Sequence, residues 1–149
     1  MKVLLVEDQK YKSDDIMTYL SSTCPEVDVC LARSYSDGLS EAMSSAYDLI
    51  LLDMTLPIFE KREGEDGEQM FEDGGRRIMR RMKSKRLSTP CYVITQYDKI
   101  QDVTIESMDI ELKKMFPDIY KKYIFYQSNS NVWKNELKKL IEDAKSSDN

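Results

Sequence analysis

The chain has 149 residues, of which 41% are hydrophobic and 33% charged, and its 22 basic and 27 acidic residues give a net charge of −5. That length suits a single domain, residues 1–149, whose core needs no disulfide or metal to hold it together. The negative charge argues against nucleic acid or an anionic membrane as a partner. Because there is no histidine, Ser-His-Asp triads, histidine zinc sites and a phosphohistidine carrier are all excluded.

Three further features lead us to expect a cytoplasmic protein. No apolar run is long enough to span a bilayer, and the first residues start a strand-like run without the pattern of a signal peptide. The three cysteines form no CxxC pair, and two of them, Cys30 and Cys91, stand in apolar stretches. We therefore expect reduced thiols buried in a protein of a reducing compartment.

Strand-like and helix-like segments alternate along the whole chain. Apolar runs that predict strands lie at residues 2–6, 27–31, 47–53, 91–95 and 123–126, and helical spacing is found at residues 11–21, 36–45, 76–85, 104–116 and 132–143. Such alternation predicts an α/β fold with a parallel sheet and right-handed crossovers. We expect a flavodoxin-like (βα)5 three-layer sandwich with strand order 2-1-3-4-5 and a ligand site beyond the carboxyl ends of the strands.

Two segments are longer than this framework requires. The first is an extended acidic loop at about residues 58–75, which holds seven acidic and two basic residues between Glu60 and Asp73. Its composition is typical of a solvated loop, and the alternative is a lid or docking element. The second is the segment at about residues 96–122, which suggests either a modified partner surface or, from its Met/Leu stripe, plain core. Seven basic residues lie between Arg76 and Arg86. They are more typical of a solvated helix face than of the alternative, a nucleic-acid patch.

Polar side chains stand where three of the predicted strands end. Glu7 and Asp8 follow the first strand, Asp53 ends the third and Thr95 ends the fourth. These strands are neighbours in the expected order, so the side chains should converge. Clustered carboxylates need a cation or protons, and oxygen ligands favour Mg²⁺. Singly, each residue is equally typical of a strand end that meets water or of a turn; their joint occurrence favours a site.

Together these motifs resemble the receiver domains of two-component response regulators. The resemblance rests on Glu7-Asp8, on Asp53-x-x-x-Pro57 and on Thr95, each at the end of its strand, and it covers roughly residues 2–58, 76–97 and 122–143. It implies a Mg²⁺-dependent signalling reaction in which Asp53 accepts a phosphoryl group from a sensor histidine kinase or a phosphotransfer protein.

The resemblance also implies roles for the other residues. Asp8 and Asp53 would ligate Mg²⁺ directly, together with the backbone carbonyl of Thr55, whereas Glu7 would act mostly through a metal-bound water. The Thr95 hydroxyl would donate a hydrogen bond to the phosphoryl group and shift its loop, which is the switch.

Three positions bear on the response to phosphorylation. The family carries a lysine at the end of strand five, but here that position is Tyr126, or Gln127 if the strand is shifted by one residue. Tyr123 matches the switch aromatic of the family, although it is equally well explained as a half-buried strand tyrosine. Gln96 stands where a small residue is usual, so it either crowds the phosphate or supplies an amide donor.

The leading hypothesis is a stand-alone receiver, because the length leaves no space for a DNA-binding output domain, with its output through contact with a downstream protein. The alternative is a pseudo-receiver, a binding module that signals without phosphorylation, which the absent lysine favours. We do not expect an enzyme. A phosphatase of the haloacid-dehalogenase type needs a second aspartate where Thr55 stands, and a nucleotide or flavin site needs a Gly-rich loop after strand one.

Overall fold

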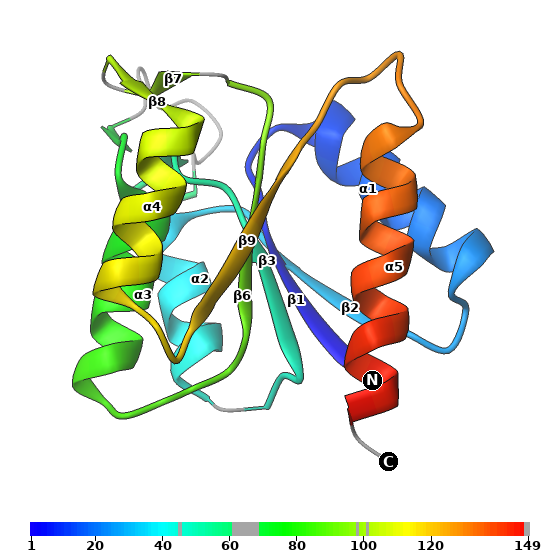
Figure 1. Ribbon diagram of the computed structural model, residues 1–149, viewed down its shortest axis with the longest axis horizontal. Helices are drawn as coiled ribbons and strands as arrows, with labels where there is room; N and C mark the ends of the chain where they lie inside the picture. Colours follow the sequence, from blue (N-terminus) through cyan, green and yellow to red (C-terminus); the bar gives the residue numbers. More distant parts are fainter. Residues whose placement is uncertain (45, 61–68, 98, 101, 148–149) are drawn as a thin grey trace.

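A parallel sheet forms the centre of the computed structural model, which describes residues 1–44, 46–60, 69–97, 99–100 and 102–147 (Figure 1). The sheet has five strands in the order β2-β1-β3-β6-β9. Their bounds are β1 Lys2–Val6, β2 Asp28–Ala32, β3 Leu49–Leu52, β6 Cys91–Thr95 and β9 Tyr120–Phe125. In chain order these are the five predicted strands, so the flavodoxin-like order 2-1-3-4-5 is confirmed.

Helices cover both faces of this sheet. One face carries α1 and α5, and the other carries α2, α3 and α4 (Figure 1). The helices are α1 Lys10–Thr23, α2 Tyr35–Met43, α3 Gly74–Ser84, α4 Ile105–Met115 and α5 Val132–Ser147. Alternate side chains of β1 pack on opposite faces of the sheet. Leu4 and Val6 belong to one buried hydrophobic cluster, and Val3 and Leu5 belong to the other. Burial on both faces explains the nearly unbroken apolar runs of the central strands.

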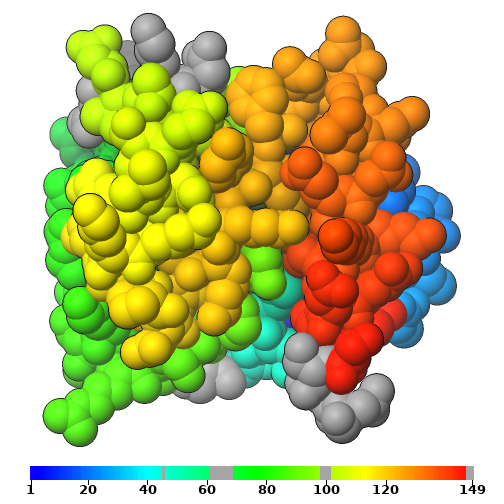
Figure 2. Space-filling model, viewed as in Figure 1, coloured from blue at the N-terminus to red at the C-terminus, as the bar shows by residue number. Residues whose placement is uncertain are grey.

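The last strand lies at the edge of the sheet, and its start differs from the prediction. Instead of residues 123–126, β9 covers Tyr120–Phe125, and Lys121 within it is exposed. Figure 2 shows atoms of β9 at the surface between α4 and α5. An edge strand tolerates charged residues that a central strand would not, which is why apolar pattern alone missed its first half.

Two short antiparallel pairs extend the loops at one end of the sheet. Strand β4 (Leu56–Pro57) pairs with β5 (Met70–Phe71), and β7 (Lys99–Ile100) pairs with β8 (Val103–Thr104). Strand β5 lies within the predicted acidic loop at about residues 58–75, and β4 lies directly before it. Residues 61–68 of this loop lie outside the described part of the chain, as do residues 98 and 101 of the enlarged segment.

The basic face of α3 is tied to its surroundings by ion pairs. Arg77 contacts Asp73 at 2.8 Å, and Arg76 contacts Glu111 of α4 at 3.1 Å. Within the described residues, no helix is long and apolar enough to cross a membrane. All three cysteines are free.

Candidate functional site

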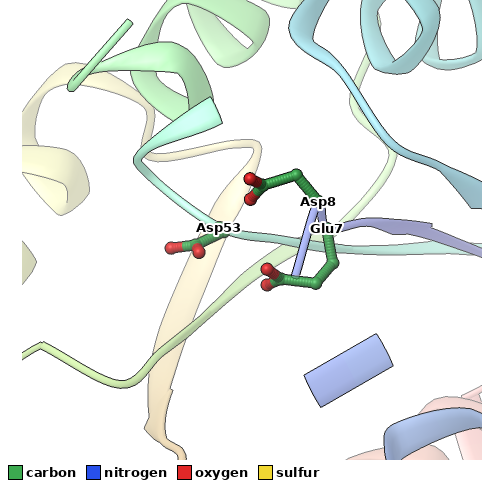
Figure 3. A group of neighbouring side chains, drawn as sticks. All are labelled: Glu7, Asp8 and Asp53. Atoms are coloured by element: carbon green, nitrogen blue, oxygen red, sulfur yellow. The ribbon is translucent and has the colours of Figure 1, made fainter. Parts of the chain in front are cut away.

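Three carboxylates meet at the carboxyl ends of β1 and β3. One oxygen from each of Glu7, Asp8 and Asp53 lies within 4.8 Å of the others (Figure 3). The cause is the register of the two strands, in which Val6 pairs with Leu52, so that the residues that follow them lie level. The Asp53 amide donates to the Val6 carbonyl at 3.1 Å, which fixes this alignment. The predicted acidic residues are thus adjacent in space.

Two of the three carboxylates in this acidic pocket, which consists of Glu7, Asp8 and Asp53, are held out of water. Glu7 is 0% exposed and Asp53 2% exposed, whereas Asp8 is half-buried. The Gln9 amide donates to Glu7 at 3.1 Å, and the Met54 amide donates to Asp53 Oδ1 at 2.7 Å. Burial and the nearby Asp53 charge outweigh the attraction of Lys12 and raise the pKa of Glu7 to about 7. Desolvation is therefore the largest influence on the ionisation of Glu7.

A lysine that was not among the predicted site residues lies inside the pocket. The Lys12 side chain is fully buried, and its ammonium lies 2.7 Å from Glu7 Oε2 and 3.3 Å from Asp53 Oδ2. It also donates to the Ile94 carbonyl at 2.8 Å. Burial alone would lower the pKa of this amine, but Asp53 and Glu7 together raise it above its ordinary value. The pocket therefore contains a permanent internal cation.

The position of Lys12 follows from the helix that carries it. The buried residues of α1 include Lys12, Ile16 and Leu20. Residues four apart lie on the same face of a helix, so Lys12 continues the stripe that packs on the sheet. This spacing is visible in the sequence. The prediction missed it because a lysine near the start of a helix is ordinarily placed in solvent.

Thr95 and Tyr126 stand side by side beyond β6 and β9. Thr95 is buried, its Oγ1 accepts from the Tyr97 amide at 3.1 Å, and its carbonyl accepts from the Tyr126 amide at 2.7 Å. The Tyr126 side chain is buried and its hydroxyl donates to Asp15 at 2.7 Å. Its ring centroid lies 5.9 Å from the Lys12 ammonium nitrogen. Gln127, by contrast, is exposed.

Gln96 is held in a polar network at the rim of the pocket. Its amide nitrogen donates to Gln9 at 2.7 Å and to the Tyr97 hydroxyl at 3.2 Å. Its carbonyl oxygen accepts from the Tyr11 hydroxyl. These contacts join the loop after β6 to the first turn of α1. The amide predicted either to crowd the phosphate or to bind it is engaged by other side chains in this structure.

The loop after β3 packs tightly against the start of α3. A Cβ added at Gly75 would lie 2.5 Å from a side-chain carbon of Leu52 and 2.7 Å from the Asp53 backbone oxygen, so only glycine fits here. Thr55 is half-buried in this loop, and its hydroxyl donates to the Glu72 carbonyl at 3.4 Å. Tyr123 is half-buried on β9 against the core, a position that fits either interpretation given above.

The donor set of the pocket suits a hard divalent cation. Every side-chain oxygen that the cluster offers belongs to a carboxylate, and the Lys12 ammonium lies next to two of the three carboxylates, Glu7 and Asp53. Hard cations such as Mg²⁺ prefer such oxygen ligands. Asp8, Asp53 and Glu7 are the residues that could hold the ion.

Comparisons with known proteins point to one signalling family, although no protein-family model matches the chain. It is 28% identical over 148 residues to the Detocs response regulatory protein DtcB of Enterobacter cloacae, covering 95% of this chain and 98% of that protein. It is 26% identical over 143 residues to the uncharacterized protein y4jR of Sinorhizobium fredii, and the match covers 93% of this chain and 95% of that protein. The crystal structure of a CheY-like response regulator receiver domain protein from Methanospirillum hungatei JF-1 has the same fold, with a TM-score of 0.66, 18% identity and coverage of 99% and 95%.

Proposed function

Because the chain belongs to the receiver domains of response regulators, we propose that Asp53 accepts a phosphoryl group from a sensor histidine kinase or a phosphotransfer protein. The observation that carries this proposal is the meeting of Glu7, Asp8 and Asp53 in one pocket at the strand ends. The output would be a contact with a downstream protein. Nucleic acid is a poor candidate partner for a chain of net charge −5.

The proposed step is an in-line displacement at phosphorus. A carboxylate oxygen of Asp53 attacks the phosphorus of the donor phosphohistidine, and the P–N bond breaks. Its electron pair stays on the imidazole nitrogen, which takes up a proton from water, and Asp53 becomes an acyl phosphate. Oδ1 of Asp53 accepts the Met54 amide at 2.7 Å and Oδ2 accepts the Lys12 ammonium at the longer distance of 3.3 Å, so Oδ2, the more loosely held oxygen, is the better placed nucleophile.

The other pocket residues would bind and orient the phosphoryl group. Mg²⁺, held by Asp8, Asp53 and the carbonyl of Thr55, with Glu7 acting through a water, would supply positive charge beside the phosphoryl oxygens. The Thr95 hydroxyl now accepts the Tyr97 amide at 3.1 Å and keeps its own proton for donation. Donation of that proton to a phosphoryl oxygen would move the loop that carries Tyr97.

Mass spectrometry of the intact protein tests the proposal. The wild type is incubated with Mg²⁺ and acetyl phosphate, whose P–O bond breaks to release acetate, and the expected result is a gain of one phosphoryl group. The Asp53→Asn variant should gain none. Asp48→Asn is the matched control, because Asp48 is exposed near the opposite end of β3, where it accepts from the Lys2 amide at 2.8 Å. It should be phosphorylated like the wild type. Uptake by Asp53→Asn would contradict the site.

A second candidate function is a binding module that signals without phosphorylation. The observation that favours it is the ion pair between Lys12 and Asp53, since a carboxylate already neutralised by an internal cation is a weaker nucleophile. In that case the wild type would bind Mg²⁺ in a calorimetric titration but remain unmodified by acetyl phosphate. The same mass measurement therefore separates the two functions.

A further inference from the structure

We propose that Lys12, from helix α1, supplies the positively charged contact to the phosphoryl group on Asp53, in place of the strand-five lysine that this chain lacks. The inference rests on the proposed function and adds a catalytic residue to it. The positive charge would thus come from α1, the first helix of the chain. It would not come from β9, which is the edge strand on the side of the sheet away from β2.

The first support is the position of the ammonium. It lies 3.3 Å from Oδ2 of Asp53, the carboxylate oxygen that does not accept the Met54 amide. A phosphoryl group joined to Oδ2 would place its own oxygens within reach of the same ammonium. Such a contact between an ammonium and an anionic oxygen is among the stronger hydrogen bonds in proteins.

The second support is what occupies the usual lysine position. Tyr126 fills it with a buried ring that packs 5.1 Å from the Trp133 ring and a hydroxyl that donates to Asp15. Its ring faces Lys12 at 5.9 Å, so the tyrosine forms part of the wall around the ammonium. In this chain the lysine stands on helix α1 and an aromatic residue stands at the end of the strand. The pocket therefore still contains one positively charged side chain.

The third support is that the Lys12 ammonium would keep its partners when Asp53 is phosphorylated. The Lys12 ammonium has three partners, which are the Glu7 carboxylate in an ion pair at 2.7 Å and two hydrogen-bond acceptors, Asp53 Oδ2 and the Ile94 carbonyl. When Oδ2 of Asp53 becomes part of an acyl phosphate, the carboxylate loses its charge and the phosphoryl oxygens carry it instead. Lys12 can exchange Oδ2 for a phosphoryl oxygen while it keeps its two other partners. The buried cation thus remains paired throughout, which avoids the large cost of an unpaired buried charge.

The test compares two lysine variants of the same helix. Lys12→Met removes the buried charge and keeps an unbranched side chain, and Lys10→Met is the matched control, because Lys10 is exposed and pairs with Asp14 instead. At saturating Mg²⁺, the rate of phosphorylation by acetyl phosphate, followed by intact mass, should fall on the order of 100-fold in Lys12→Met, as when one donor to a developing charge is removed. Lys10→Met should react like the wild type.

A second readout separates a charge effect from a structural one. In a titration with Mg²⁺ alone, Lys12→Met should bind the ion roughly tenfold more tightly, because a cation that opposes it is gone. A general loss of pocket structure would weaken Mg²⁺ binding and slow phosphorylation together. Opposite changes in the two measurements are therefore the signature of the proposal. Lys12→Gln, a neutral variant that can still donate to Glu7 and Ile94, is judged by the same criteria if Lys12→Met does not fold.

The outcomes of these measurements test the role of Lys12 separately from the proposed phosphorylation of Asp53. If the wild type gains no phosphoryl group, the proposed function falls and the role of Lys12 with it. If the wild type is phosphorylated and the Lys12 variants react as fast or faster, only the role of Lys12 is overturned. Slower reaction with weaker Mg²⁺ binding would also overturn it, since Lys12 would then serve to hold the pocket together.

Discussion

Replacing Glu7 with glutamine should remove a pH dependence from the stability of the protein. In the folded chain Glu7 is fully buried and its pKa is raised to about 7, chiefly by burial and then by Asp53, against a reference value of 4.5. Below the reference value both folded and unfolded chains hold the proton. Between the two values only the folded chain does, so stability should fall as the pH rises, and above about 7 it should level off.

The size of the effect follows from the two pKa values. Integrating proton release from 4.5 in the unfolded chain and about 7 in the folded chain gives a loss of about 2–3 kcal/mol between about pH 5 and about pH 8. Glu7→Gln cannot ionise, so this loss should be absent from the variant. The difference in unfolding free energy, variant minus wild type, should therefore rise by the same amount across that interval.

Urea unfolding followed by circular dichroism, with EDTA present to remove divalent cations, measures this difference at each pH. Any offset that does not depend on pH cancels between the two ends of the interval. Glu142→Gln, at an exposed site on α5, is the control and should show no comparable trend. A Glu7→Gln difference that stays constant within about 0.5 kcal/mol would refute the reasoning, because it would mean that burial does not hold the proton on Glu7.

Three further predictions concern packing and the cation. Gly75→Ala should lower the unfolding free energy by about 2 kcal/mol in urea, because its Cβ would meet Leu52 at 2.5 Å; an unchanged midpoint would contradict the close approach. Tyr126→Phe should cost about 1 kcal/mol by the same assay through loss of the bond to Asp15, and no cost would mean that water replaces it. Mg²⁺ should raise the melting temperature of the wild type and removal by EDTA should reverse the rise, whereas Asp8→Asn should respond weakly; an equal response would place the ion elsewhere.

The fold was predictable because the strands that carry it are buried on both faces. Three apolar runs marked the inner strands β1, β3 and β6, and the alternation of strands with helices predicted the sheet order. The edge strand β9 was placed too late, because Lys121 and Lys122 break the apolar pattern. The pairs β4–β5 and β7–β8 are two-residue strands, which are too short to show any periodicity.

The candidate site was predictable only in part. Glu7, Asp8 and Asp53 were placed together by the rule that neighbouring parallel strands end at one edge of the sheet. Lys12 was missed because its role depends on the rotation of α1 against the sheet, which brings a residue from the helix under the strand ends. The four-residue spacing to Ile16 contained that information, but a charged residue on a buried face is too rare to be the first expectation.

The most direct test of the central claim is to locate the phosphoryl group chemically. Protein treated with Mg²⁺ and acetyl phosphate is reduced with borohydride, which converts an aspartyl phosphate to homoserine, and the digested peptides are sequenced by mass spectrometry. We expect homoserine at position 53 in the wild type, with aspartate retained at positions 8 and 48. Homoserine at another position, or at none, would contradict the assignment of Asp53 as the phosphoryl acceptor.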